Sequence, residues 1–178
     1  MGWKYKKLIY LNERYNLIDM FIKGDSMKKK IILLLVIVSL FMLTGCSTKT
    51  PLEANDFVDL VEQNNYKTTN VVEQFSTYAQ IKNAFVAQDS EMRYQIEYYE
   101  LDTDENAKTF FEGNKKIFEQ QSNKKSHSSV NLNNYNKYSQ STETVYSVIS
   151  RIDNTVIYAN VKIEYKKEVQ DIIKKLGY

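Results

Sequence analysis

A run of apolar residues near the start of the chain, Ile31 to Leu43, limits which residues can belong to a folded domain. Its thirteen residues would span about 20 Å as a helix, less than the roughly 30 Å hydrocarbon core that a membrane-spanning helix must cross. Lys28, Lys29 and Lys30 come directly before it. A basic segment followed by a short apolar segment is typical of an export signal. We therefore expect the folded domain to be built from the residues after the run.

The run ends in Leu43, Thr44, Gly45 and Cys46. These residues resemble the lipobox of bacterial lipoproteins, in which a leucine and two small residues precede an obligatory cysteine. The resemblance implies that Cys46 receives a diacylglyceryl group, and that a signal peptidase recognises Leu43, Thr44 and Gly45 and cleaves before Cys46. Two acyl chains give a stable anchor, whereas one gives marginal binding. We therefore expect a lipid-anchored protein on the extracytoplasmic face of the cell membrane. The alternative is that Cys46 is an ordinary thiol after an uncleaved anchor.

These features divide the chain into four segments. Residues 1–26 precede the signal, and the codons that can encode Lys23, Gly24 and Asp25 resemble a ribosome-binding site before Met27. We therefore predict that translation starts at Met27 and that residues 1–26 are a mis-assigned extension; the alternative is a genuine cytoplasmic tail. Residues 27–45 are the predicted lipoprotein signal peptide, residues 46–51 a lipidated tether, and residues 52–178 a single extracytoplasmic domain.

The charge of the predicted mature chain differs from that of the whole sequence. Residues 1–45 hold 8 Lys or Arg against 3 Asp or Glu, so the net charge of +2 for the full chain becomes −3 for residues 46–178. A domain without a basic surplus gives no reason to expect a nucleic acid partner. Cys46 is the single cysteine, so lipidation would leave no thiol for a disulfide, a metal or redox chemistry. The abundance of residues with AT-rich codons suggests a low-GC bacterium.

Hydrophobic periodicity predicts an α+β domain. Helices are expected to begin at Pro51, within a capping box from Thr50 to Glu53, and after Asp102, and a third is expected over Glu164 to Leu176. Strands are expected near residues 66–72, 81–88, 92–98, 135–140, 143–152 and 155–163. Because strands and helices do not alternate as βαβ units, this order favours an antiparallel sheet with helices packed mainly on one face. The order is similar to that of small uncharacterised lipoproteins of low-GC Gram-positive bacteria.

Two finer expectations concern the middle of the domain. The second helix is expected to bury Ala107, Phe110, Phe111, Ile117 and Phe118. The polar segment from Ser122 to Asn134 is predicted to be a mobile connection, and it contains His127, the one histidine of the chain. A histidine in a mobile loop lacks the third group that would orient it for catalysis. We therefore predict no catalytic residues, no metal site and no cofactor.

The enrichment in Asn and Tyr is the feature that favours a ligand-binding role. Asn134, Tyr135 and Tyr138 place stacking rings beside amide groups, as glycan-binding sites do, and are the candidate ligand contacts. The alternative is that AT-rich codons and a half-exposed sheet account for them. We expect a non-catalytic domain that binds an unknown protein or glycan partner. Two other hypotheses stay open: a peptidoglycan-related envelope enzyme or its accessory, and a protective or immunity lipoprotein.

Overall fold

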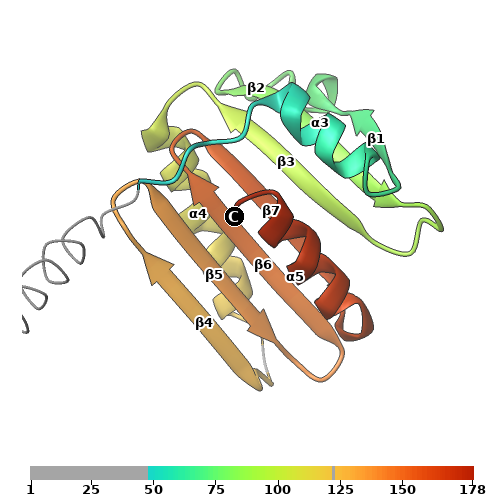
Figure 1. Cartoon of the computed structure of the whole chain (residues 1–178). Helices are drawn as coiled ribbons and strands as arrows, with labels where there is room; N and C mark the ends of the chain where they lie inside the picture. Colours follow the sequence, from blue (N-terminus) through green and yellow to red (C-terminus); the bar gives the residue numbers. More distant parts are fainter. Residues whose placement is uncertain (1–47, 122) are drawn as a thin grey trace, which may run out of the picture. The chain divides into compact units, whose positions relative to one another are not determined.

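Seven strands form one antiparallel sheet in the computed structural model, which describes residues 48–121 and 123–178 (Figure 1). The strands are β1 (Tyr66–Asn70), β2 (Ile81–Asp89), β3 (Gln95–Leu101), β4 (Ser126–Asn131), β5 (Tyr135–Ser141), β6 (Val145–Ile152) and β7 (Thr155–Lys162). Their order across the sheet is β1-β2-β3-β7-β6-β5-β4, and every neighbouring pair is antiparallel. The last strand in sequence therefore lies at the centre of the sheet, next to β3.

The helices cover both faces of this sheet. The described α-helices are α3 (Ala54–Glu62), α4 (Asp104–Glu119) and α5 (Lys166–Lys175). Two 3-10 turns, η2 (Val72–Phe75) between β1 and β2 and η3 (Ile163–Tyr165) before α5, complete the described helical elements. Helices α3 and α5 pack on one face and α4 on the other (Figure 1). The expectation of an α+β fold with an antiparallel sheet and helices mainly on one face is confirmed. Within the described residues, the helices are too short or too polar to cross a bilayer.

Strand alternation sends the side chains of each strand into two separate cores. On β3, Ile96 and Tyr98 enter the core under α3 and α5, whereas Tyr99 and Leu101 enter the core under α4. The ring of Phe57 from α3 stacks on that of Tyr98, with centroids 4.9 Å apart. Full burial of such a side chain contributes about 1.5–3 kcal/mol, so both cores stabilise the central strands.

The first helix begins later than expected. Its N-cap is Glu53, which is extended and makes no capping hydrogen bond through its side chain, so the predicted capping box and the start at Pro51 are wrong. Tertiary contacts hold the preceding segment instead, because the Tyr98 hydroxyl donates to the carbonyl oxygen of Leu52 at 2.8 Å. This bond fixes an extended backbone where the local pattern favours a helical turn.

The second helix follows its predicted stripe except at Ile117, with Phe110 only partly buried. Ala107, Phe111 and Phe118 are buried, but Ile117 is 59% exposed, so its predicted burial is wrong. The helix is capped by Thr103, whose hydroxyl accepts from the backbone N–H of Asn106 at 3.2 Å.

The segment predicted to be a mobile connection contains a strand. β4 pairs with β5 from Ser126 opposite Ser141 to Asn131 opposite Asn136, so this prediction is wrong. Most β4 side chains are exposed because it is an edge strand, and its sequence therefore lacks hydrophobic alternation. His127 lies on this edge strand, opposite Gln140, and not in a loop.

Candidate functional site

The predicted anchoring residues fall outside the part of the chain that the structure describes. These residues are Leu43, Thr44, Gly45 and Cys46. The predicted tether, residues 46–51, is described from Thr48 onward. The amide nitrogen of Asn134 donates to the carbonyl oxygen of Lys49 at 2.6 Å and to Asp153 Oδ2 at 3.2 Å. The tether is therefore docked on the domain from Lys49.

The three predicted ligand contacts do not share an exposed surface. Tyr135 is 7% exposed in the core under α3 and α5, whereas Tyr138 is 3% exposed in the core under α4. The Tyr138 hydroxyl donates to Gln140 Oε1 at 2.9 Å, and the Asn134 amide holds Lys49. The structure therefore gives these residues packing and tethering contacts on two different faces of the sheet.

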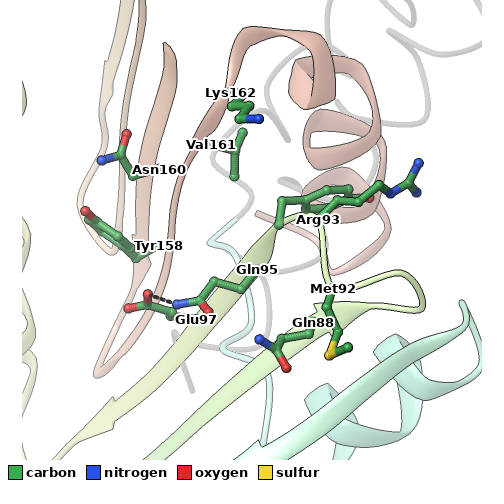
Figure 2. A pocket seen from close by; sticks show the side chains of 10 residues that line it. Gln88, Met92, Arg93, Gln95, Glu97, Tyr158, Asn160, Val161 and Lys162 are labelled. Carbon is green, nitrogen blue, oxygen red and sulfur yellow. Dashed lines mark hydrogen bonds between the residues drawn. The ribbon is translucent and has the colours of Figure 1, made fainter. Parts of the chain in front are cut away.

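A cleft that the sequence reasoning missed lies where β3 and β7 separate. The two strands pair from Glu100 opposite Thr155 to Glu97 opposite Tyr158, and the ladder pairs no residue beyond. β7 nevertheless continues to Lys162. A cavity of about 480 Å³ lies at this separation (Figure 2). It is lined by Gln88, Met92, Arg93, Tyr94, Gln95, Glu97, Tyr158, Asn160, Val161 and Lys162.

Polar side chains form the walls of the cleft, and they come from alternate positions on both strands. Gln95 and Glu97 extend from β3, while Tyr158, Asn160 and Lys162 extend from β7 (Figure 2). Strand alternation puts all of them on the sheet face that carries α4. The walls therefore offer amide groups, a phenol and one charge of each sign.

Aromatic residues close the cleft on the opposite face. Tyr94 and Val161 pack with the core under α3 and α5. The ring of Tyr94 stacks on Tyr165 with centroids 4.9 Å apart, and its hydroxyl lies 2.9 Å from that of Tyr66. The cleft consequently has an apolar floor and opens toward the α4 face.

Hydrogen bonds fix the orientation of the wall residues. Gln95 Nε2 donates to Glu97 Oε1 at 2.8 Å, and the Tyr99 hydroxyl donates to Glu97 Oε2 at 2.5 Å. Burial and the bond to Glu97 raise the pKa of Tyr99, so this phenol stays protonated as a donor. Ser147 Oγ donates to Asn160 Oδ1 at 3.0 Å, which leaves the amide nitrogen of Asn160 as a donor for other groups.

The turn between β2 and β3, at one end of the cleft, is organised by a buried carboxylate. Asp89 is 4% exposed, and its Oδ1 accepts from the backbone N–H groups of Arg93 at 2.5 Å and Tyr94 at 3.0 Å. Its Oδ2 accepts from Arg93 Nε at 2.8 Å. Burial alone would raise the pKa of Asp89, but the bonds from Arg93, Tyr94 and Glu91 outweigh it and hold the pKa below its usual value.

Backbone groups also border the cleft. The N–H of Leu101 donates to the carbonyl oxygen of Asn154 at 2.9 Å, so Leu101 directs its backbone groups toward β7. In an antiparallel pair, every second residue directs its N–H and C=O toward the partner strand. Beyond the last pair, Glu97 and Tyr158, the next residues that direct their backbone groups toward the opposite strand are Gln95 and Asn160. Their strand edges therefore face each other across the cleft without being joined in the ladder.

The arrangement suits binding better than paired-carboxylate hydrolysis. Glu97 is the one carboxylate among the residues that line the cleft, whereas glycoside hydrolysis uses two facing carboxyl groups. Glu100 lies three positions further along β3, on the opposite face, and accepts from Asn83 Nδ2 at 2.8 Å. Over residues 48–121 and 123–178, no group of three His, Cys, Asp or Glu side chains is placed to hold a metal ion.

A smaller cavity of about 340 Å³ lies between the segment that follows β1 and helix α4. It is lined by Phe75, Tyr78, Gln80, Ile81, Asn106, Thr109 and Phe110. Its walls are more apolar than those of the cleft and carry no charged side chain among these residues.

Comparisons with known proteins add little to this geometry. No protein-family model matches the chain, and no curated protein matches it. Among solved structures, a GTP binding regulator from Thermotoga maritima aligns with a TM-score of 0.43 and 15% sequence identity, over 71% of this chain and 92% of that chain. A likeness at this level carries no argument about function.

Proposed function

We propose that this protein is a lipid-anchored, extracytoplasmic lipoprotein whose domain binds a ligand in the cleft between β3 and β7 without catalysing a reaction. The lipobox from Leu43 to Cys46 supports the anchor, and the cleft supports binding. Its volume of about 480 Å³ falls within the roughly 300–1,000 Å³ that is usual for ligand sites.

The observation that carries the binding proposal is the fixed orientation of the wall residues. Glu97 is held by Gln95 and Tyr99, and Asn160 is held by Ser147. Side chains that are already ordered lose little conformational entropy when a ligand arrives, so a preorganised polar cleft binds more tightly than a mobile one. A single wall carboxylate, oriented by two donors, favours recognition of a ligand over acid–base hydrolysis.

Binding is tested on the full-length protein in detergent micelles by nuclear magnetic resonance of its side-chain amides. The probes are a mixture of free-ended tetrapeptides and, separately, chitotetraose. We expect one probe class to shift the side-chain amide resonances of Gln95 and Asn160, and to leave unshifted that of Gln74, an exposed glutamine outside the cleft. Binding in the cleft is refuted if neither probe class perturbs these resonances.

Anchoring is tested by metabolic labelling with a fatty acid. The wild type and Thr50→Ala, which lies beyond the lipobox, should take up the label and sediment with membranes. Cys46→Ala should take up no label and should lose its stable anchor, because the cysteine thiol is the acyl acceptor. Equal labelling of Cys46→Ala and the wild type would exclude lipidation at this position.

A further inference from the structure

We infer that the cleft takes a short peptide in extended conformation, which enters the sheet between β3 and β7 as an additional strand. This inference rests on the proposed function and deepens it by naming the chemical class of the ligand. The two strand edges at Gln95 and Asn160 carry the argument.

An open strand edge is a template for another strand, because it presents a row of N–H and C=O groups. Peptide recognition by strand addition uses one such edge. Here two edges face each other across one cleft, at Gln95 on β3 and Asn160 on β7. A strand placed between them would pair with β3 at Gln95 and with β7 at Asn160, so it would find hydrogen-bond partners on both sides.

The spacing of donors and acceptors favours a peptide over a sugar. An extended peptide directs an N–H and a C=O to the same side at every second residue, roughly every 7 Å. Residues of β3 direct theirs toward β7 at the same repeat: those of Glu97 are paired with Tyr158, and those of Gln95 are the first beyond the ladder. Because β3 and β7 are antiparallel, the inserted strand would run parallel to one and antiparallel to the other, as in the mixed sheets of many proteins.

The charges at the two ends of the cleft set the length of the peptide. Lys162 lies four residues beyond Tyr158 on β7, and Tyr158 is paired with Glu97. At about 3.3 Å per residue, the backbone positions that carry these two charges are roughly 13 Å apart along the strands. Figure 2 shows Glu97 and Lys162 at opposite ends of the cleft. A free tetrapeptide has this reach, with its amino group next to Glu97 and its carboxylate next to Lys162.

The test uses the full-length protein in detergent micelles and an immobilisable library of free-ended tetrapeptides. The tightest peptide is resynthesised with N-methyl groups on its central amides. We expect methylation to weaken binding about tenfold or more, because each methyl group removes a hydrogen bond and leaves a strand edge unpaired. The unmethylated peptide should also slow hydrogen exchange at the backbone amides of Gln95 and Asn160.

Variants of the protein separate backbone recognition from side-chain recognition. Asn160→Pro removes the N–H that faces the cleft, while the matched Asn160→Ala keeps it. We expect the proline variant to lose binding and the alanine variant to keep it within about threefold. If the proline variant does not fold, the affinities of the methylated and unmethylated peptides for the wild-type protein test backbone recognition instead. Glu97→Gln should weaken the free peptide but not its N-acetylated form.

The outcomes distinguish this inference from the proposed function. Equal affinity for methylated and unmethylated peptides overturns strand insertion. Chitotetraose that binds the cleft when no peptide does overturns the peptide assignment and leaves a binding domain. If neither probe class shifts the resonances of Gln95 and Asn160, the proposed binding site itself is refuted.

Discussion

Asn134 and Lys49 bind each other through two hydrogen bonds across 85 residues of sequence. Asn134 Nδ2 donates to Lys49 O at 2.6 Å, and Lys49 N donates to Asn134 Oδ1 at 3.3 Å. The side-chain amide thus pairs with the tether as a neighbouring backbone amide would. The ammonium group of Lys49 donates to the carbonyl oxygen of Gly177 at 2.6 Å and lies 3.9 Å from the ring centroid of Tyr135.

Replacing Asn134 should release the tether. We expect Asn134→Ala to lower the free energy of unfolding by about 1–3 kcal/mol, because Lys49 and Asp153 both lose a partner. Trypsin should then cleave after Lys49 faster than in the wild type, as followed by mass spectrometry. Asn133→Ala, at the exposed neighbouring position, is the control and should change neither quantity. Unchanged cleavage in Asn134→Ala would mean that other contacts hold the tether.

The buried carboxylate of Asp89 should control the turn beside the cleft. We expect Asp89→Ala to cost about 2–4 kcal/mol, because the N–H groups of Arg93 and Tyr94 lose their acceptor. The pKa of Asp89 is lowered in the folded protein, so its contribution is complete above the unfolded value near 3.8 and is lost as the pH falls through the folded value. Chemical denaturation as a function of pH measures both effects. Ser90→Ala, at an exposed position in the same turn, should leave the profile unchanged.

Tyr178 should contribute to the loss of stability in alkali. It is 4% exposed, and burial raises its pKa to about 12. Because Thr155 Oγ1 donates to the carbonyl oxygen of Ile152 at 2.7 Å, the hydroxyl of Tyr178 is the donor in its bond to Thr155. Ionisation would remove that donor.

The pH window follows from the direction of this shift. Tyr178 in the unfolded chain loses its proton near pH 10, whereas the folded chain keeps it to about pH 12. The stability linked to this group is therefore complete below pH 10, and about 2–3 kcal/mol is lost between pH 10 and 12. We expect Tyr178→Phe to make this part of the stability profile less steep, because burial also raises the pKa of other tyrosines such as Tyr98 and Tyr99. Urea denaturation measures the slope. Tyr78→Phe, where the tyrosine is 56% exposed, should retain the wild-type slope.

Gln140 should fasten the end of α4 to the sheet. Its Nε2 donates to the carbonyl oxygen of Phe118 and to Gln121 Oε1, both at 2.7 Å, and its Oε1 accepts from Tyr138. We expect Gln140→Ala to cost about 2–4 kcal/mol and to accelerate hydrogen exchange in the last turn of α4. Tyr138→Phe removes one of the three bonds and should cost only about 1 kcal/mol. Equal losses in the two variants would contradict this assignment.

The sequence predicted most of the sheet because its central strands alternate clearly. The strands expected over 143–152 and 155–163 leave two residues between them, and the chain turns there with Asp153 at a positive φ of +48°. β4 escaped prediction because Ser126–Asn131 is an exposed edge strand, held mainly by backbone bonds to β5. Local pattern likewise misplaced the start of α3, where a tertiary bond from Tyr98 to Leu52 decides the backbone.

The cleft could not be predicted because it depends on two strands that are distant in the sequence. The alternation of Gln95 and Glu97 with Ile96 and Tyr98 was visible, but the pattern is the same for any solvent-facing strand surface. What makes these residues a site is the end of pairing with β7 after Glu97. Conversely, composition alone suggested that Tyr135 and Tyr138 contact a ligand, but both side chains are buried in the cores of the domain.

The docked tether sets which end of β7 lies nearer the point where the chain enters the domain. Two residues separate Cys46 from Lys49, and Lys49 is bound to Gly177, next to the residue whose hydroxyl contacts Thr155 at the start of β7. Asn160 lies five residues further along that strand, or about 17 Å away. With acyl chains on Cys46, the cleft would therefore lie toward the end of β7 that is farther from the point where the tether docks.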